Sequence, residues 1–439
     1  MTDFSIVRRS LVSRPFSTVT TVVMVAISVA LMLVLLSMRH SAERAFSSGP
    51  GNMHLLVSRD NSPLTSVLNN IFHAGAPPRP ILMSEYERIA ESFPLDYAIP
   101  TQLGDSYRGL PVVATTEEFF TRFEPVIGRA WQFAEGRAFE REYEVVVGAD
   151  AARRTGLRLG SQIFLTHGTG RAAALAESSG QTEGVVAGTL AAHVHKEFVF
   201  TVVGILAPSG GPHDRALFVN LESSWILHAH DRRLEQSPGA PLTTLADITP
   251  ADRLITGMYL RVLTRPGSEI TSAIAPVFAR LRADPTLVVA QPGSEIQKLF
   301  VIVGNIDRIF LAMAVVVMVS SAISIMVALY NSMEQRRRQV AVLRVLGCSR
   351  ARLFGLIVTE SAMIGLLGAA AGLVLAFIGG QMASEAIERR LELVIQPALG
   401  PETVLMVVVG TVLLASLAGI APAMVAYRTA VAKNLRPLG

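Results

Sequence analysis

The chain has 439 residues, of which 50% are apolar and only 17% are charged, and its mean hydropathy of +0.43 indicates a membrane protein rather than a soluble one. Its net charge of +4 does not indicate nucleic-acid binding, because the basic residues cluster beside apolar blocks and no basic patch is interleaved with aromatic residues. The single Cys348 excludes an intrachain disulfide, so any large soluble part must be stabilised by its own core.

Four apolar stretches are long enough to cross a membrane as helices. The first, residues 16–38, has no charge and is about 34 Å long at the helical rise, which spans a hydrocarbon core of about 30 Å. A cleaved signal peptide is the alternative, but its apolar core is usually only about 7–15 residues long. The other spans are predicted at residues 309–330, 354–383 and 404–427.

Arginines are distributed unevenly around these spans. They precede the first span, follow the fourth and cluster between the second and third, so the positive-inside rule places residues 1–15, 331–353 and 428–439 in the cytoplasm. Residues 39–308 and the short loop 384–403 then face outward. The sequence therefore predicts an α-helical membrane protein with four transmembrane helices and a large extracytoplasmic domain inserted between helices 1 and 2.

Residues 39–308 have the pattern of a mixed α/β domain. Short segments rich in Val, Ile, Phe and Tyr, bounded by turn residues, predict strands, and helical spacing of apolar residues predicts helices. The predicted strands are 53–58, 143–147, 198–206 and 258–263, and the predicted helices are 84–92, 116–123 and 268–283. Residues 167–196 are rich in Gly, Ala and Ser, which predicts a long loop inserted between two strands.

Histidines gather in and after this insertion. His167, His193, His195 and His228 are candidate zinc ligands, because imidazole is a common ligand of that metal, and Asp214 and Asp231 lie near them in the sequence. His193 and His195 are two residues apart, as are His228 and His230, which places both rings on one face of a strand but on opposite sides of a helix. Solvated loop histidines without a metal are the alternative.

The motifs of common enzymes are absent from the sequence. It contains no Gly-x-x-x-x-Gly-Lys-Ser/Thr phosphate loop, no His-Glu-x-x-His metalloprotease helix and no Gly-x-Ser-x-Gly nucleophile elbow. We therefore predict a chain that is not an enzyme and that binds no ATP in the manner of a P-loop protein. Any dependence on ATP must come from a separate partner chain.

The third span contains one ionisable residue and several glycines. Glu360 is a functional candidate because a charge at membrane depth is costly, although pairing with a basic residue or contact with the interface would also explain it. Gly365, Gly368 and Gly372 allow another helix to approach closely, so helix packing is their predicted role.

The cytoplasmic segment between the second and third spans is basic at its start and then amphipathic. Val340, Leu343 and Leu346 have near-helical spacing, and Gly347 is a predicted helix stop. Such a helix can anchor in membrane lipid at the interface, or its apolar face can dock into the groove of a partner protein.

Two parts of the sequence resemble a known family. The segment Glu-Gln-Arg-Arg-Arg-Gln-Val-Ala-Val-Leu-Arg-Val-Leu-Gly-Cys-Ser at 334–349, followed by Glu360 and the glycines of the third span, is similar to the FtsX-like, MacB-type permeases of ABC systems. The ending Leu-Ala-Gly-Ile-Ala-Pro-Ala at 417–423, with Leu-Arg-Pro at 435–437, is also similar.

This resemblance implies a permease subunit in the bacterial inner membrane, with both termini cytoplasmic, that forms a homodimer. It implies two copies of an ABC-type ATPase, which carry the ATP and Mg, docked on the segment between the second and third spans. The residues expected to couple to that ATPase are Arg337, Arg338, Val340, Leu343, Arg344, Leu346 and Gly347.

The expected function is mechanotransmission, in which ATP hydrolysis moves the periplasmic domain for substrate transport or extraction, with a periplasmic adaptor or substrate-binding protein as a further partner. Two alternatives stay open. One is a non-transporting FtsX-like regulator that activates an external cell-wall enzyme, and the other is a metal-responsive membrane sensor that uses the histidines.

Overall fold

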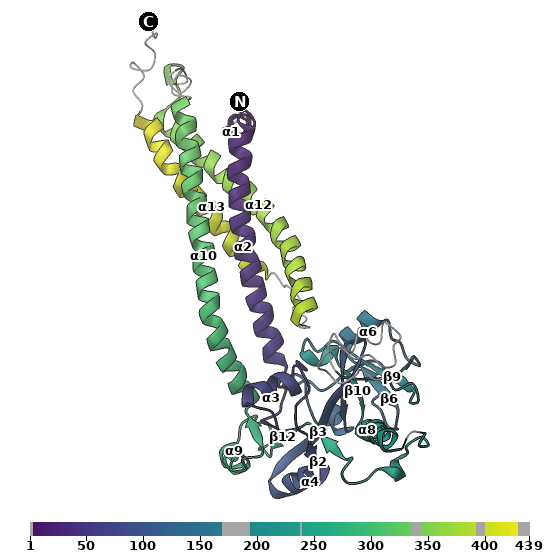
Figure 1. Ribbon diagram of the computed structural model, residues 1–439. Coiled ribbons are helices and arrows are strands. Elements are labelled where there is room, and N and C mark those ends of the chain that lie inside the picture. The colour runs from purple at the N-terminus through teal and green to yellow at the C-terminus, as the bar shows by residue number, and fades with distance from the viewer. Residues whose placement is uncertain are drawn as a thin grey trace. The chain divides into compact units, whose positions relative to one another are not determined.

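The computed structural model describes residues 3–168, 194–237, 239–335, 342, 344–391 and 400–428, and the chain divides into two compact units (Figure 1). The helical unit contains Met1–Ala42 and Ile302–Gly439, and the sheet unit contains Glu43–Val301. The sheet unit is therefore inserted after the first long helix.

Five long or N-terminal helices of the described residues lie wholly or mostly in the helical unit, and they are α1 (Asp3–Val12), α2 (Pro15–Ser48), α10 (Pro292–Gln335), α12 (Arg350–Leu391) and α13 (Pro401–Arg428). Four of them contain stretches long and apolar enough to span a membrane, at Pro15–Ser41, Arg308–Met333, Arg350–Ser384 and Pro401–Arg428. Large apolar side chains such as Phe16, Val316 and Met406 are exposed on these helices. Contact of so many large apolar side chains with water is unfavourable, whereas their contact with lipid is favourable.

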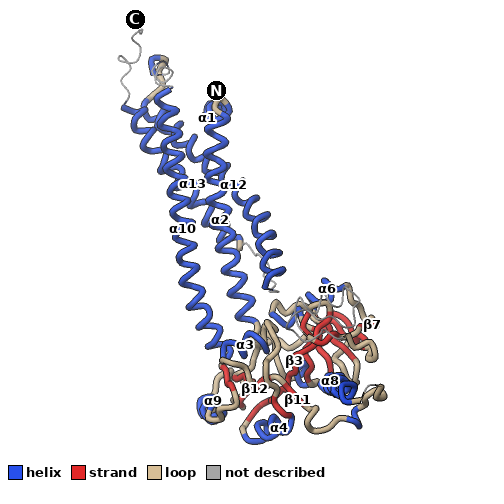
Figure 2. The backbone as a smooth tube through the Cα atoms, in the orientation of Figure 1, coloured by secondary structure: helices blue, strands red, loops and turns tan. Residues whose placement is uncertain are grey.

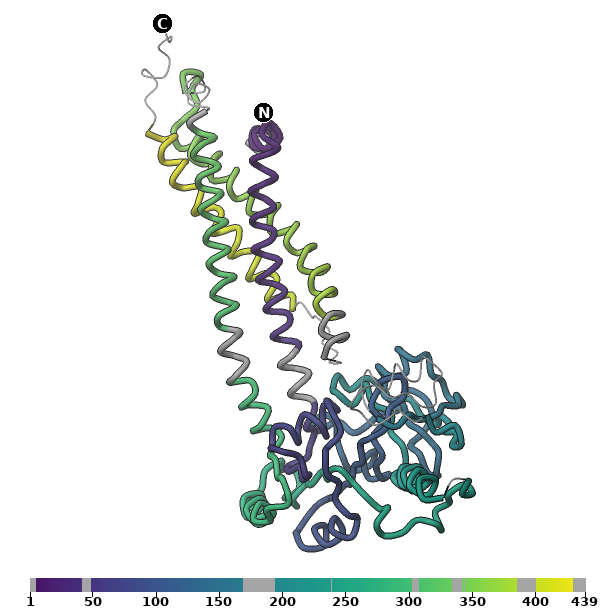
Figure 3. The backbone as a smooth tube through the Cα atoms, in the orientation of Figure 1, coloured from purple at the N-terminus to yellow at the C-terminus, as the bar shows by residue number. Residues whose placement is uncertain are grey.

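All five of these helices contribute to one core in the helical unit, although they come from both ends of the sequence. Val29 of α2 is buried with Leu329 of α10, Ile364 of α12 and Ala415 of α13. Figure 3 shows the purple N-terminal helix beside the green and yellow helices of the C-terminal part. The bundle therefore joins segments that the whole sheet unit separates in the sequence.

Within the described residues, the sheet unit contains thirteen strands, and strands are drawn in red in Figure 2. They are β1 (Leu55–Ser58), β2 (Ile81–Leu82), β3 (Leu95–Tyr107), β4 (Leu110–Thr115), β5 (Phe133–Gly136), β6 (Glu144–Val147), β7 (Gln162–Ile163), β8 (Thr166–His167), β9 (Phe200–Leu206), β10 (Leu217–Asn220), β11 (Leu254–Ile255), β12 (Gly257–Val262) and β13 (Val288–Ala290).

Eleven of these strands form one sheet. Its main path runs β13-β1-β12-β3-β4-β10-β6-β9-β5, with β7 paired to β9 and β8 paired to β3, while β2 and β11 form a separate pair. The β10–β4 and β6–β9 pairs are parallel. Both connections between these parallel partners include helices, as parallel pairing requires a crossover.

Helices cover both faces of the sheet, and they are α3 (Pro63–Asn70), α4 (Met83–Ser92), α5 (Glu118–Thr121), α6 (Ala149–Thr155), α8 (Leu221–Gln236) and α9 (Ile274–Arg282), with short 3-10 turns at Pro212–Arg215 and Leu245–Asp247. Central strands are consequently apolar on both faces. In β10, Leu217 and Val219 face a core that includes α8 and α9. Phe218 faces the opposite core, which includes α3 and α5.

The predicted fold class is confirmed, because four long apolar helices are present and a large mixed α/β domain lies between the first and the second. The strand predicted at 198–206 is β9, which begins two residues later. Most of the predicted insertion lies outside the described residues. The chain reaches Gly168 and returns at Val194, and Thr166 and Val194 form an antiparallel bridge.

Candidate functional sites

A cluster of histidines and aspartates lies where β3, β8 and α8 come together in the sheet unit. Asp105 of β3 and His167 of β8 are directly opposed in the antiparallel pair. The register of β3 shifts against β4 between Leu103 and Asp105, which is a bulge of the kind that redirects side chains. Asp105 Oδ1 lies 3.3 Å from His167 Nδ1 and 3.3 Å from His228 Nε2.

Helix α8 places His228 and Asp231 on one side of the helix, since residues three apart share a face. The helix begins where the Asn220 side chain accepts a hydrogen bond of 2.8 Å from the Glu222 N–H. The Trp225 indole donates to the Leu254 carbonyl at 2.7 Å, and Arg232 pairs with Asp252 at 2.7 Å. These contacts fix the rotation of α8 about its axis.

His230 lies on the other side of α8 from His228. Its Nδ1 is 3.1 Å from the Thr243 hydroxyl, and its ring contacts Phe198 edge-on with centroids 5.3 Å apart. His228 and His230 are therefore on opposite sides of a helix, and of the two only His228 reaches the cluster.

His195 is fully buried beside the same cluster. Its backbone N–H donates to the Leu165 carbonyl at 2.9 Å, and its ring Nδ1 lies 3.5 Å from Asp231 Oδ1. Potential ligand atoms of His167, His195 and Asp231 all lie within 4.8 Å of one another, as do those of Asp105, His167 and His228. The structure thus brings together three of the four predicted histidines, while His193 lies outside the described residues.

Asp105 was not predicted as a ligand from the sequence, whereas Asp231 lies beside the predicted histidines in the sequence. Asp105 is buried in a strand whose side chains are mostly buried but of mixed polarity, so no local pattern in the sequence marks it. Burial alone would raise the pKa of the Asp105 carboxyl, but the neighbouring His228 and His167 reverse this effect and hold the pKa below its ordinary value. The hydrogen bond to Asp105 raises the pKa of His167 above its ordinary value, against the effect of burial.

In the helical unit, Glu360 of α12 accepts a hydrogen bond of 2.6 Å from the Ser10 hydroxyl of α1. Glu360 is half-buried in this contact. The N-terminal helix therefore supplies a polar partner for the one acidic residue predicted within the third span.

The predicted packing glycines of α12 lie against two different helices. A Cβ atom built on Gly372 would lie 2.7 Å from Val29 Cβ of α2, and one built on Gly368 would lie 2.6 Å from Val25 Cβ of the same helix. A Cβ on Gly365 would lie 2.5 Å from Ala415 Cβ of α13. Each distance is shorter than real carbon contacts, so these positions need glycine.

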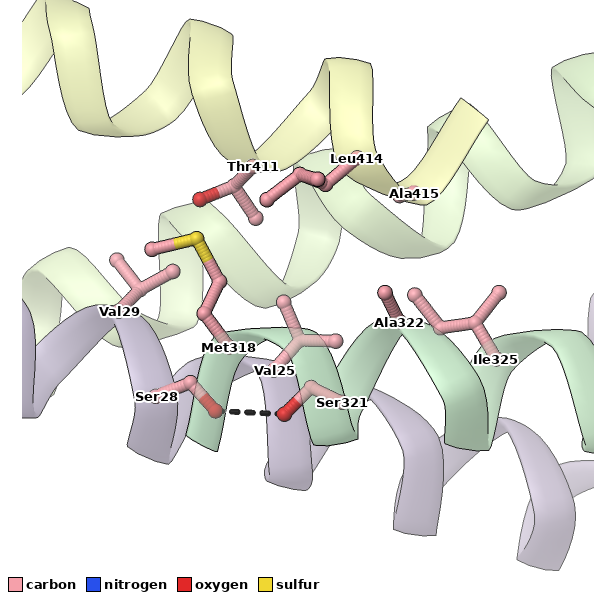
Figure 4. Close-up of a pocket in the computed structure, with 10 residues that line it drawn as sticks. All are labelled: Val25, Ser28, Val29, Met318, Ser321, Ala322, Ile325, Thr411, Leu414 and Ala415. Carbon is pink, nitrogen blue, oxygen red and sulfur yellow. Dashed lines mark hydrogen bonds between the residues drawn. The ribbon is translucent and has the colours of Figure 1, made fainter. Parts of the chain in front are cut away.

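A small pocket lies among α2, α10 and α13 in the helical unit (Figure 4). Its lining is mostly aliphatic, with Met318 and Ile325 from α10 and Leu414 from α13. The hydroxyls of Ser28 and Ser321 hydrogen-bond to each other at 2.6 Å across α2 and α10. Thr411 donates to its own helix at 2.7 Å, so the polar atoms of this pocket are already bonded.

Two family models match this chain. One describes a MacB-like periplasmic core domain and matches residues 18–277, which is more than half of the chain. The other describes the C-terminal part of FtsX-like permeases and matches residues 311–431. The chain belongs to the FtsX-like, MacB-type family of ABC transporter permeases. It is a multi-pass membrane protein with four spans, in a family whose members are typically non-catalytic membrane subunits of ABC systems.

Among solved structures, the chain is similar to the extracellular domain of the noncanonic ABC-type transporter YknZ from Gram-positive bacteria. The match covers 54% of this chain and 98% of that domain at 9% sequence identity, with a TM-score of 0.25. No curated protein sequence matches the chain. The family assignment therefore rests on the two family models.

The segment of the permease that was predicted to couple to an ATPase is described only in part. Arg337, Arg338, Val340 and Leu343 lie outside the described residues. Leu346 is 78% exposed, and its N–H donates to the Val342 carbonyl at 3.0 Å, as in a helical turn. Gly347 has φ +95°, a left-handed conformation that favours glycine and ends the turn.

Proposed function

We propose that this permease is the membrane subunit of an ABC complex in which a separate ATPase moves the sheet unit, and that this movement transports or extracts a substrate. The observation that carries the proposal is the match of both family models to one chain whose sequence contains no phosphate loop. A chain of this kind needs the ATPase of a partner.

The orientation follows from the arginines at the ends of the spans. The positive-inside rule favours both termini and the segment between α10 and α12 in the cytoplasm, and the sheet unit outside it. The proposed localisation is the inner membrane of a bacterium. The proposed assembly is a dimer of this chain with two ATPase copies, together with a periplasmic adaptor or substrate-binding protein.

The proposed docking surface for the ATPase is the segment between α10 and α12. In its described part, Val345 and Leu346 are 64% and 78% exposed, although both are large apolar residues. The nearby Arg344 and Arg350 add positive charge. An exposed apolar pair beside basic residues suits the groove of a partner protein.

The test begins with the tagged chain purified in mild detergent. We expect a P-loop ATPase to co-purify, with ATP hydrolysis that vanadate inhibits. A cargo or adaptor protein recovered outside the membrane supports transport, whereas a cell-wall hydrolase supports the regulatory alternative. Recovery of the intact chain without any ATPase, from cells that express all partners, contradicts the proposal.

A substitution then tests the docking surface. Leu346→Asp places a charge on an exposed apolar position, so it should lower co-purified ATPase activity at least about tenfold, equivalent to about 1.4 kcal/mol of binding free energy. Leu343→Asp, on the same predicted face, should have the same effect. Ile270→Asp is the matched control, because Ile270 is 80% exposed in the sheet unit. Equal activity in Leu346→Asp and Ile270→Asp would exclude this surface.

A further inference from the structure

We propose that Asp105, His167 and His228 form a binding site for one divalent cation of the zinc type in the sheet unit. The site is separate from the coupling segment of the helical unit and does not depend on the proposed function. Two histidines and a carboxylate are a ligand set that zinc accepts, with a fourth position left for water or another side chain.

The distances between the potential ligand atoms carry the proposal. Two ligands that are each about 2.0–2.1 Å from a tetrahedral zinc ion lie about 3.3 Å apart. Asp105 Oδ1 is 3.3 Å from His167 Nδ1 and 3.3 Å from His228 Nε2. Two edges of the expected tetrahedron are therefore already present, and all three donor atoms lie within 4.8 Å of one another.

The same distances are long for hydrogen bonds. An N–H···O hydrogen bond is usually about 2.9 Å long between its heavy atoms, whereas both contacts to Asp105 are 3.3 Å. The rings of His167 and His228 are nearly perpendicular, at 83°, so they approach one carboxylate oxygen from different directions. This arrangement suits ligands around an ion better than two hydrogen bonds.

Gln102 supplies the outer hydrogen bond that a metal-bound histidine needs. Its side-chain amide lies 2.8 Å from His228 Nδ1, while its Oε1 is buried without a hydrogen-bond partner among the described residues. Exchanging the amide O and N positions lets Oε1 accept a hydrogen bond from Nδ1–H, which leaves the lone pair of Nε2 for the metal. Such outer hydrogen bonds orient metal-bound histidines.

Candidates for the fourth position lie beside His167. Donor atoms of His195 and Asp231 lie within 4.8 Å of one from His167. Asp231 is on α8 three residues after His228, and its side chain is 27% exposed, so a rotamer change can bring its carboxylate to the ion. A bound ion would join β3, β8 and α8, three segments far apart in a chain that has one cysteine and no disulfide.

The experiment uses the full-length chain in detergent, carrying an affinity tag without histidines. After treatment with a chelator, Co²⁺ is titrated while visible absorption is recorded, and Zn²⁺ is then added in competition. We expect one equivalent of Co²⁺ per chain, absorption bands typical of tetrahedral coordination, and complete displacement by one equivalent of Zn²⁺.

Four variants identify the ligands. His167→Ala and His228→Ala should each weaken zinc binding by more than about 100-fold, and Gln102→Leu by about 10–100-fold. His230→Gln is the matched control, because His230 lies on the same helix but contacts Thr243 and Phe198 instead. Size-exclusion profiles of the metal-free variants check that they remain folded.

The outcomes are distinct. Loss of binding in His167→Ala and His228→Ala, with retention in His230→Gln, supports the site. Zinc affinity within twofold of the unmodified chain in both alanine variants overturns it, as does the absence of saturable binding in the unmodified chain. If His228→Ala fails to fold, His167→Ala decides alone, because the His167 side chain is 37% exposed.

Discussion

The helical unit and the sheet unit achieve close packing in opposite ways. In the helical unit, α12 approaches α2 through Gly368 and Gly372, where no side chain is present. In the sheet unit, Phe119 is fully buried against five other aromatic side chains and His213. Lipid provides no hydrophobic driving force between helices, so van der Waals contact through small residues replaces it. In water, burial of large apolar side chains supplies that force.

The largest loss of stability is expected when a ring is removed from the aromatic core of the sheet unit. Phe119→Ala removes a ring that contacts Trp131 with centroids 5.6 Å apart, and it should lower the free energy of unfolding of this unit by about 3–5 kcal/mol. Both tryptophans, Trp131 and Trp225, belong to the sheet unit. Urea unfolding of the full chain followed by tryptophan fluorescence therefore reports this unit.

The control for that substitution is Ile270→Ala. Ile270 is 80% exposed, so its truncation should change the free energy of unfolding by less than about 0.5 kcal/mol. Equal effects of Phe119→Ala and Ile270→Ala would mean that the aromatic core does not stabilise the sheet unit.

A second, smaller loss of stability should appear when the pH is lowered, because the same core contains buried histidines. Burial lowers the pKa of His213 to about 4 from an ordinary value of 6.5. Burial, then the proximity of His213 and Arg215, lowers the pKa of His73 as well. Between pH 6.5 and about 4 the unfolded chain binds protons that the folded core does not, so stability falls as the pH falls. Below about pH 4 the contribution of His213 levels off.

The measurement compares the slope of unfolding free energy against pH in the unmodified chain and in His213→Gln, with a chelator present in both. The slope over pH 4–6.5 should be smaller in the variant, by at most about 1.4 kcal/mol per pH unit. Identical slopes would show that His213 is protonated in the folded state at the same pH as in the unfolded chain.

The sequence predicts features that depend on neighbouring residues better than features that depend on residues far apart in the chain. Spans of more than twenty apolar residues are local features, so the four membrane helices are visible without any partner. The strand at 143–147 was also predicted from local pattern and is found at Glu144–Val147. The cluster around His167 depends on pairing between β3 and β8, which are about 60 residues apart. Asp105 was missed because no local spacing connects it to a histidine.

The glycines of α12 offer the next test. Gly372→Ala places a methyl group 2.7 Å from Val29 Cβ and 2.8 Å from the Ala26 carbonyl oxygen, so α12 must move away from α2. We expect a loss of about 1–3 kcal/mol, as for other overpacked sites. The measurement is the temperature at which half of the detergent-solubilised chain leaves the monodisperse peak in size-exclusion chromatography.

Gly379→Ala is the matched control on the same helix. A Cβ atom there meets only Val34 at 3.7 Å, an ordinary contact, so the midpoint temperature should stay close to that of the unmodified chain. If Gly372→Ala is as stable as Gly379→Ala, the approach of α12 to α2 does not need glycine.

The smallest effect is expected for the hydrogen bond between Ser28 of α2 and Ser321 of α10, which joins two buried hydroxyls at 2.6 Å. Hydrogen bonds between membrane helices contribute only about 0.6 kcal/mol on average, because each hydroxyl finds other partners when the bond is lost. Both serines can also donate to carbonyls of their own helices, at 2.8 Å for Ser28 and 2.9 Å for Ser321.

The test is a double-mutant cycle of Ser28→Ala, Ser321→Ala and the double variant, measured by the same chromatographic midpoint. A coupling energy of about 0.6 kcal/mol is expected, whereas one above about 2 kcal/mol would mean that polar contacts, and not glycine-mediated approach, hold the helical unit together.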